Sequence, residues 1–221
     1  MKLKVLLACE ESQAVTKEFR KLGHEAYSCD LLPTSGKNKK WHIQDDVFNV
    51  IERENWDLMI AFPPCTHLAV SGARHFDKKK KDGRQKESIK FFKSLTNTKI
   101  KYWIIENPVG IMSTVYKKPN QIIHPYYFGD PYSKKTCLWF SKGLSNLNHY
   151  SKEDKKKDKS VKVTHTNPGE FVTFPSGKKM PKWYNEGRNN GFERSKTFPG
   201  IAKAMAVQFS EQILKLEKSK K

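Results

Sequence analysis

The first half of the chain alternates short apolar runs with stretches of helical periodicity. The apolar runs have the length and composition of buried strands, and each ends near polar residues or prolines. They are Lys2–Ala8, Glu25–Cys29, Trp56–Phe62 and Lys101–Ile105. Between them, apolar residues recur at helical spacing, as in Val15, Phe19 and Leu22 before Gly23, and in Ile89, Phe92 and Leu95. Strands that alternate with helices predict an α/β fold with a doubly wound, mostly parallel sheet.

The second half is less regular until its last helix. Residues 151–162 are mostly charged and of low complexity, so we expect a mobile loop there. Residues 166–190 are rich in proline, glycine, asparagine and aromatic residues and show little periodicity. A final helix is predicted from about Gly200, because apolar residues then recur every fourth position. These residues are Ile201, Met205, Phe209 and Ile213.

The length of the chain limits the number of domains. With 221 residues it can form one sizeable core with a small appendage, and it is short for two full domains. We therefore expect a main domain over residues 1–140, a small irregular insertion over residues 141–195, and a C-terminal helix over residues 196–221 that returns to the main domain.

Residues capable of chemistry follow two of the predicted strands. In doubly wound sheets, ligands bind beyond the carboxyl ends of the strands. Pro63 and Pro64 restrict the backbone and remove two N–H donors, so this turn can hold the Cys65 side chain in a fixed, exposed direction, as a nucleophile requires. A single loop cysteine is more often without function.

A carboxylate follows the next strand. Glu106 comes directly after the four apolar residues 102–105, at the mouth of the predicted core. Desolvation at such a position raises the pKa of a carboxyl group into the range useful for acid catalysis. Either segment alone is a weak signal. Pro-Pro-Cys after one strand and Glu-Asn after the next form a rare combination with one well-known use.

Through Pro63–Cys65 and Glu106–Pro108, the chain resembles the cytosine-C5 DNA methyltransferase family, and in particular its short, phage-like members. The resemblance extends over nearly the whole chain. It implies a Rossmann-like class I methyltransferase fold, S-adenosylmethionine as the cofactor and DNA as the substrate. The thiolate of Cys65 would add to carbon 6 of a cytosine flipped out of the duplex, while Glu106 hydrogen-bonds or protonates N3 and carbon 5 accepts the methyl group.

The resemblance also implies where the cofactor binds. It places the site at the loop after the first strand, at acids that end the second strand and follow the third, and beside the last helix. The implied cofactor-binding residues are Ala8, Cys9, Glu10, Ser12, Asp30, Leu31, Asp45, Asp46, Pro63 and Ala202. Because ACEESQ stands where the family has a glycine-rich loop, Glu10 or Ser12 is expected to help hold the methionine moiety.

Further residues are implied to contact the substrate. They are Pro64, Ser71, Arg74, Asn107, Arg188 and Arg194. Ser71 and Arg74 lie in a segment that the resemblance makes a lid over the flipped base. The family's Gln-Arg-Arg motif is missing, and Lys135 is its nearest counterpart, so we include Lys135 with the catalytic residues as a contact to the base or its phosphate. Lysine keeps the charge but lacks the planar fork of arginine.

Aromatic residues in the second half have two interpretations. Side chains of this kind can stack on bases, or they can form a small core of their own, which is the commoner arrangement. The residues concerned are Trp139, Phe140, Trp183, Tyr184 and Phe192.

The charge of the chain favours a nucleic-acid partner. The formal net charge is +19 and the isoelectric point is about 9.7, with lysines in several clusters. Each phosphate that such a surface neutralises releases counterions, although lysine-rich surfaces also occur for solvation alone. The predicted insertion is small for a recognition domain, so we expect it to read about two to four base pairs, at about one base for each bidentate side chain.

Cysteine spacing and hydropathy exclude other classes. The four cysteines form no C-x-x-C pair, so we expect no structural zinc, no bound metal and no disulfide framework. No signal-peptide pattern is present, and no apolar run is long enough to cross a bilayer. We expect a soluble monomer in the cytoplasm of a bacterium or a phage-infected host.

Two alternatives stay open. The same chemistry can act on RNA or on a free cytosine nucleotide, although the positive charge disfavours a mononucleotide. A nucleic-acid-binding protein that has lost turnover is the non-enzymatic alternative, supported by the altered first loop. A cytosine deaminase is disfavoured because the His-x-Glu and Pro-Cys-x-x-Cys ligands are missing.

Overall fold

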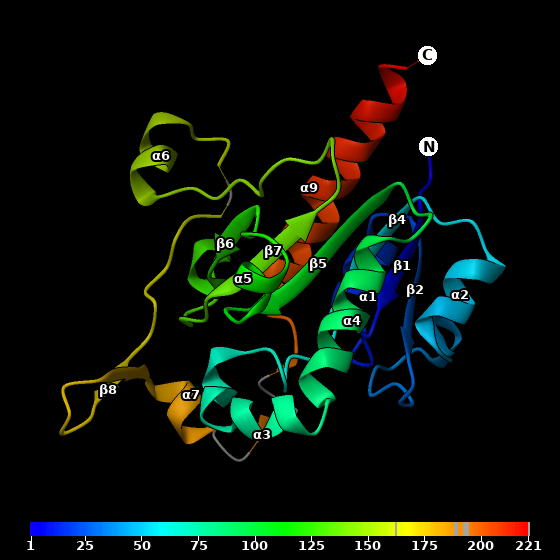
Figure 1. Cartoon of the computed structure of the whole chain (residues 1–221). Helices are drawn as coiled ribbons and strands as arrows, with labels where there is room; N and C mark the ends of the chain where they lie inside the picture. The colour runs from blue at the N-terminus through cyan, green and yellow to red at the C-terminus, as the bar shows by residue number, and fades with distance from the viewer. Residues whose placement is uncertain (162, 188–189, 192–194, 221) are drawn as a thin grey trace.

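A seven-stranded sheet forms the centre of the computed structural model, which describes residues 1–161, 163–187, 190–191 and 195–220, with Arg74 described by its backbone alone. The strand order is β3-β2-β1-β4-β5-β7-β6 (Figure 1). The strands are β1 (Lys4–Ala8), β2 (Glu25–Asp30), β3 (His42–Gln44), β4 (Leu58–Ala61), β5 (Tyr102–Pro108), β6 (Gln121–Ile123) and β7 (Thr136–Phe140). Strands β1 to β5 pair in parallel, and β7 is antiparallel to both β5 and β6. The predicted α/β class with a mostly parallel sheet is confirmed.

Helices cover both faces of this sheet. On one face lie α1 (Ala14–Lys21) and the long α9 (Pro199–Lys218), and on the other lie α2 (Val47–Arg53), α4 (Arg84–Thr96) and α5 (Met112–Val115). Side chains alternate along each strand, so Val5 and Leu7 pack toward α1 and α9, whereas Leu6 and Ala8 pack toward α2 and α4. All four are fully buried. Near-continuous apolar strands are required because parallel sheets are covered on both faces.

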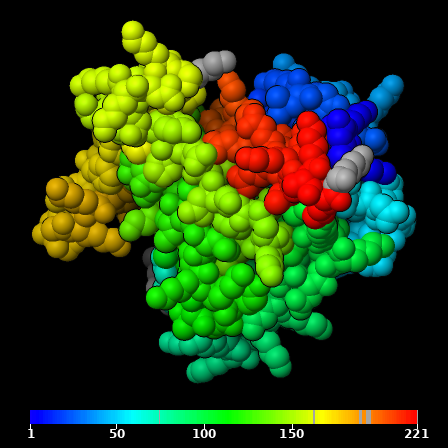
Figure 2. Space-filling view, turned by 90° about the horizontal axis from the view of Figure 1, so that it is seen from above, coloured from blue at the N-terminus to red at the C-terminus, as the bar shows by residue number. Residues whose placement is uncertain are grey.

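Smaller elements surround the sheet. They are the 3₁₀ helices η1 (Lys39–Trp41), η2 (Val70–His75) and η3 (Pro125–Phe128), the helices α3 (Phe76–Lys81), α6 (Lys152–Lys157) and α7 (Lys182–Glu186), and a separate two-stranded sheet of β8 (Phe171–Thr173) and β9 (Lys179–Pro181). In the space-filling view the segments around α6 and around β8–β9 project at one side of the molecule (Figure 2). Among the described residues, no helix is long and apolar enough to cross a membrane.

The loop expected over residues 151–162 is wrong in part, because helix α6 forms there. The Ser151 hydroxyl accepts a hydrogen bond from the Asp154 N–H at 3.1 Å, and the Asp154 carboxylate accepts one from the Ser151 N–H at 2.7 Å. This reciprocal capping box satisfies two N–H groups at the start of the helix, and the lysines that follow lie at its C-terminal end, where positive charge is favoured. The high density of charge obscured this capping signal in the sequence.

Two of the aromatic residues considered for base stacking belong to the main sheet. Trp139 and Phe140 lie in β7 and are 0% and 5% exposed. The Trp139 indole donates a hydrogen bond to the Lys117 carbonyl at 2.8 Å and packs edge-on against Phe92. A stacking role on bases is therefore excluded for these two residues, which build the core instead.

The strand order determines where a ligand can bind. From β1 the chain first adds β2 and β3 on one side, and then β4 and β5 on the other. The carboxyl ends of β1 and β4 therefore flank the topological switch point, where open α/β sheets bind ligands. The Phe62 N–H donates to the Ala8 carbonyl at 2.9 Å, so the two loops that follow these strands start side by side.

Candidate active site at the carboxyl ends of the central strands

The loop after β4 presents Cys65 in a tight turn. Pro63 is buried and Pro64 is exposed, and the Cys65 side chain is partly exposed between them and the turn that follows. The Cys65 carbonyl accepts hydrogen bonds from the N–H groups of Leu68 and Ala69, both at 2.9 Å. This turn reverses the chain directly after Cys65, so the residue lies at the edge of the sheet, near the surface.

Asn107 connects the loop of Cys65 to the end of β5. Its amide nitrogen donates a hydrogen bond to the Pro63 carbonyl at 2.9 Å, and Asn107 is 1% exposed. The amide oxygen of Asn107 is buried and has no hydrogen-bond partner among the described residues. Strand register leads to the same proximity, because Ala61 in β4 lies opposite Ile105 in β5. The segments that carry Cys65 and Glu106 are thus held together by a buried contact between their neighbours.

Glu106 lines a small cavity between the sheet and the segment before α9. The cavity volume is about 10 Å³, enough for about one water molecule. Its lining residues are Glu106, Lys134, Thr136, Ser195, Lys196, Thr197, Phe198 and Ile201. Burial raises the pKa of the Glu106 carboxyl group, and the positive charge of Lys134 opposes this shift. A carboxyl group in this environment holds its proton at higher pH than an exposed one, as an acid catalyst must.

Lys134, which the sequence analysis did not single out, lies beside Glu106. Lys135 is exposed and is not among the residues that line the cavity. Alternation along β7 explains the difference, because Leu138 lies opposite Glu106 and residues two apart share a face of the sheet. Residues Lys134, Thr136 and Leu138 therefore share the face of the sheet on which Glu106 lies, and Lys135 lies on the opposite face. This alternation could have been read from the sequence if β7 had been recognised as a strand.

The loop after β1 adopts a conformation that usually needs glycine. Cys9 and Gln13 both have φ of 58°, in the left-handed region. Gln13 is fully buried, and its side chain bonds both the N–H and the carbonyl of Asn38, at 3.3 Å and 2.7 Å. Gly36 lies directly against this side chain, since a Cβ atom there would be 2.2 Å from the Gln13 Oε1. Hydrogen bonds from Gln13 thus hold this loop without glycines.

Glu10 caps helix α1. One carboxylate oxygen accepts from the Val15 N–H at 2.6 Å, and the other accepts from the Thr16 N–H at 3.2 Å and the Thr16 hydroxyl at 2.6 Å. Glu10 is 4% exposed, and this burial raises its pKa to about 7, against the opposing effect of those hydrogen bonds. Its predicted contact to the methionine moiety stays a prediction, and any such contact must share a carboxylate already bonded to the helix.

The raised pKa of Glu10 should make the stability of the fold depend on pH. Because this pKa is raised from 4.5 to about 7 on folding, the protonated carboxyl group contributes fully to the free energy of unfolding below about pH 4.5, and this contribution is lost as the pH rises through about 7. Glu10→Gln mimics the protonated form at all pH values. We expect the free energy of unfolding of the wild type to fall relative to Glu10→Gln by up to about 3 kcal/mol across this window, measured by urea unfolding. A difference that does not vary with pH would contradict this.

The acids at the ends of β2 and β3 differ in what their side chains already bind. Asp30 ends β2, and its carboxylate accepts from the Leu32 N–H at 2.9 Å. Hydrogen bonds from the Asn49 side chain and the Asp46 N–H lower the Asp45 pKa, and so does the ion pair of Asp45 with Arg53 at 2.8 Å. Asp46 caps helix α2 by accepting from the Phe48 N–H at 2.8 Å. Asp30, partly exposed beside the switch point, is the acid best placed for a ligand.

The other residues predicted to contact the cofactor surround the same loops. Leu31 is 70% exposed directly after Asp30. Ser12 accepts a hydrogen bond from the Ala14 N–H at 3.4 Å at the start of α1. Ala8 ends β1 in the core, and Ala202, which is 1% exposed in α9, packs in the core beside Ile201. Their cofactor contacts stay predictions.

The residues predicted to contact the substrate are only partly described. Ser71 is exposed in η2, which follows the Cys65 loop, and the backbone of Arg74 belongs to the same 3₁₀ helix. Arg188, Arg194 and the aromatic Phe192 lie outside the described residues. The described aromatic residues of this region contact one another: Trp183 packs against Tyr132, Tyr184 and Phe198. Trp183 and Tyr184 stay partly exposed, and Tyr132 and Phe198 lie outside the predicted insertion, so these rings do not form a separate buried core, and base stacking by Trp183 and Tyr184 stays a prediction.

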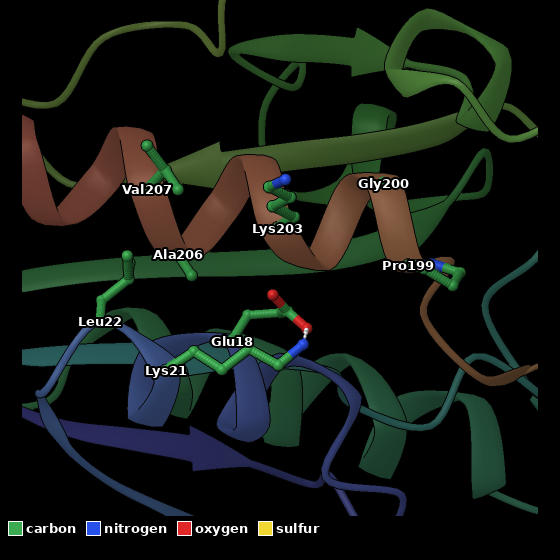
Figure 3. Close-up of a pocket in the computed structure, with 8 residues that line it drawn as sticks. All are labelled: Glu18, Lys21, Leu22, Pro199, Gly200, Lys203, Ala206 and Val207. Atoms are coloured by element: carbon green, nitrogen blue, oxygen red, sulfur yellow. Dashed lines mark hydrogen bonds and ion pairs between the residues drawn. The ribbon is translucent and has the colours of Figure 1, made fainter. Parts of the chain in front are cut away.

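A larger groove lies away from these loops, between α1 and α9 (Figure 3). Its volume is about 400 Å³, and its lining includes the Glu18–Lys21 ion pair, Lys203 and the small residues Gly200 and Ala206. None of the predicted site residues lines it. Within the described part of the chain, no group of three or more His, Cys, Asp or Glu residues is arranged to hold a metal ion.

Comparison with known proteins adds little about function. No protein-family model matches the chain, and no curated protein matches it. Among solved structures, it is similar to an E. coli protein encoded within a prophage and described as a candidate DNA modification methyltransferase, with 15% sequence identity and a TM-score of 0.45. The match covers 63% of this chain and 46% of that protein, so the chain spans less than half its length. The activity must therefore be inferred from the residues at the sheet edge.

Proposed function

We propose that this chain belongs to the cytosine-C5 methyltransferases and transfers a methyl group from S-adenosylmethionine to carbon 5 of cytosine in DNA. One observation carries the proposal. A Pro-Pro-Cys loop follows β4, the partly exposed Glu106 lies near the end of the adjacent parallel strand β5, and the hydrogen bond from Asn107 to the Pro63 carbonyl joins the two segments. A thiol and a carboxylic acid brought to one edge of a sheet suit covalent activation of a pyrimidine.

The reaction divides the work between these two side chains. The Cys65 sulfur forms a bond to carbon 6 while the Glu106 carboxyl group donates a hydrogen bond or its proton to N3, which directs the electron pair of the 5,6 double bond to carbon 5. Carbon 5 would then take the methyl group, with S-adenosylhomocysteine as the leaving group. Transfer of the carbon-5 proton to water restores the double bond and breaks the carbon–sulfur bond, which regenerates the thiolate, and Glu106 takes back any proton that it gave to N3. Burial of Glu106 supports this role, since its raised pKa favours the protonated form.

The loops at the switch point suit the proposed cofactor. S-adenosylmethionine supplies an electrophilic methyl group on a sulfonium centre, and its ribose hydroxyls need an acceptor. Asp30 offers a partly exposed carboxylate at the end of β2, and the exposed Leu31 beside it offers an apolar surface for the adenine ring. The backbone around Cys9, turned into the left-handed conformation, would flank the methionine moiety. The antiparallel β7 between β5 and β6 also agrees with a class I methyltransferase sheet.

A nucleic acid rather than a free nucleotide is the proposed substrate. The net charge of +19 favours a polyanion. The target base must leave its stack to reach Cys65, at a cost of a few kcal/mol that contacts in the pocket and to phosphates offset. The cavity beside Glu106 holds about one water molecule, so the segment from Ser195 to Phe198 must move outward before a pyrimidine can enter.

A direct comparison of substrates tests the proposal. Purified protein with radiolabelled S-adenosylmethionine should transfer label to duplex DNA, and much less to tRNA or dCMP. Transfer to tRNA or dCMP instead would move the same chemistry to another substrate. Binding of nucleic acid with no transfer to any of the three, and no cofactor binding by calorimetry, would support the inactive binding protein.

The recognition site should be short. The segment between β7 and α9 is small, and its parts around α6 and around β8–β9 project at one side of the molecule (Figure 2). We expect methylation at sites of about two to four base pairs, because a surface of this size places few bidentate side chains on base edges. Bisulfite sequencing of DNA from cells that express the protein measures this directly. Methylation confined to a long site would contradict the expectation.

A further inference from the structure

Lys79 is a buried lysine at the back of the Cys65 loop. It belongs to α3 and is 7% exposed, whereas its neighbours Lys78 and Lys80 are exposed. Its ammonium nitrogen donates a hydrogen bond to the Thr66 carbonyl at 2.5 Å. Among the described residues, no carboxylate forms an ion pair with Lys79. Burying an ammonium group without a counter-ion costs free energy, and the hydrogen bond to the Thr66 carbonyl offsets part of this cost.

A second buried polar side chain binds the next carbonyl of the same loop. Gln85, at the start of α4 and 4% exposed, donates its amide N–H to the His67 carbonyl at 3.2 Å. Helices α3 and α4 are consecutive and pack against each other. Helices α3 and α4 therefore each provide one side chain that binds a carbonyl directly after Cys65, at Thr66 and at His67.

The opposite side of the loop is fixed to β5 and the residues after it. Asn107 binds the Pro63 carbonyl, the Ile111 N–H donates to the Leu68 carbonyl at 3.0 Å, and a Cβ atom on Gly110 would lie 2.2 Å from that Leu68 oxygen. These contacts hold residues at the two ends of the loop. Thr66 and His67 lie in the turn that the Cys65 carbonyl closes, and among the described residues Lys79 and Gln85 are the side chains that bind their carbonyls.

The geometry points to Lys79 and Gln85 as positioning residues for the Cys65 nucleophile. By fixing the two carbonyls that follow Cys65, they determine where the sulfur lies relative to the end of β5. Lys79 passes close beneath η2 as well, because a Cβ atom on Gly72 would be 3.1 Å from its ammonium nitrogen. A displacement of η2 or α3 would therefore move Lys79, and with it the Thr66 carbonyl next to Cys65. The inference rests on the proposed function for its catalytic consequence, but the positioning itself can be measured without turnover.

Alkylation of Cys65 measures its position directly. The full-length protein is treated with iodoacetamide, and modification of each cysteine is followed by mass spectrometry of its peptide. In Lys79→Met the Thr66 carbonyl is released, so the sulfur should become accessible more often, and its alkylation should speed up about tenfold or more, as loss of a hydrogen bond to a charged donor implies. Gln85→Leu should act in the same direction, with a smaller effect because its donor is neutral.

The chain supplies matched controls. Lys80→Met changes an exposed lysine on the same helix, and Lys86→Leu changes an exposed neighbour of Gln85, so neither should alter the alkylation of Cys65. Cys29 and Cys137 are fully buried and report on general loosening of the fold. Unchanged Cys65 alkylation in both Lys79→Met and Gln85→Leu would overturn the inference, as would a parallel rise at Cys29 and Cys137.

Kinetics provides a second readout where methyl transfer occurs. Misplacement of the nucleophile should lower kcat by about tenfold or more in Lys79→Met, while the KM for DNA changes little because Lys79 is buried. A rise in KM with unchanged kcat would make Lys79 a binding residue and contradict the positioning role. If the wild type transfers no methyl group, the proposed function fails, and the alkylation result still decides the positioning of Cys65.

Discussion

Replacing Cys65 with serine is expected to abolish covalent capture of DNA that contains 5-fluorocytosine. In the wild type, fluorine replaces the proton that must leave carbon 5, so the bond between the Cys65 sulfur and carbon 6 cannot break after methyl transfer and the complex persists. A serine hydroxyl at the same position is a far weaker nucleophile near neutral pH. The adduct should be visible as a band of reduced mobility on a denaturing gel, in the presence of S-adenosylmethionine only.

A second cysteine variant controls for indirect effects. Cys137 lies in β7 and is fully buried, so Cys137→Ala removes a thiol close to the site without removing the proposed nucleophile. Capture should survive in Cys137→Ala. An adduct that forms equally well in Cys65→Ser would identify another nucleophile and remove the basis of the proposed mechanism.

Glu106→Gln is expected to lower the rate of methyl transfer by about 10²- to 10⁴-fold, the usual contribution of a general acid. Glutamine has the same size and keeps a hydrogen-bond donor, but it cannot transfer a proton to N3. Cofactor binding should be unaffected. Single-turnover kinetics, together with calorimetry for S-adenosylmethionine, separates the loss of chemistry from loss of binding. A loss of less than about tenfold would exclude Glu106 as the general acid.

The pH dependence of the same reaction has a definite sign. Glu106 acts in its protonated form, so the rate should fall as the pH rises through its raised pKa. The positive charge of Lys134 opposes the increase in the Glu106 pKa, because it stabilises the carboxylate. In Lys134→Met the alkaline limb of the pH profile should therefore move to higher pH. A shift to lower pH would mean that Lys134 contributes in another way than through its charge.

The fold was largely predictable because its main signals are local. Strands β1 and β4 are nearly continuous apolar runs, and the apolar face of α9 recurs every fourth residue, so periodicity alone predicted these elements. The short β3 has no such run and was not predicted from periodicity. Helix α6 was missed because its lysines resemble a solvated loop, and only the Ser151–Asp154 capping box distinguishes the two. Strand β7 was missed as a strand, so Trp139 and Phe140 were mistaken for candidates at a binding surface.

The site was predictable at the level of segments and less so at the level of single side chains. Cys65 follows β4, and Glu106 lies in the adjacent β5 where its apolar run ends, so the sequence placed both near the carboxyl ends of strands. The capping role of Glu10 depends on where α1 begins, and the choice between Lys134 and Lys135 depends on the pairing of β7 with β5. The contact of Lys79 with Thr66 joins residues 13 positions apart across a loop and leaves no periodic trace in the sequence. Such contacts depend on tertiary packing, which local patterns do not encode.

The attachment of α9 limits how the pocket beside Glu106 can open. The Gly200 N–H donates to the Asp130 carboxylate at 2.7 Å, and a Cβ atom on Gly200 would lie 2.2 Å from the Phe128 carbonyl oxygen, so the first turn of this helix is locked to η3. The residues that close the pocket, Ser195 to Phe198, end just before this anchor. We expect the segment to swing about this anchor at Pro199 and Gly200, so that the twenty-residue helix stays in place. The contacts that such a swing must break are those of Phe198 with Tyr132, Trp183 and the core beneath it, so admission of a base is coupled to the packing of these aromatic rings.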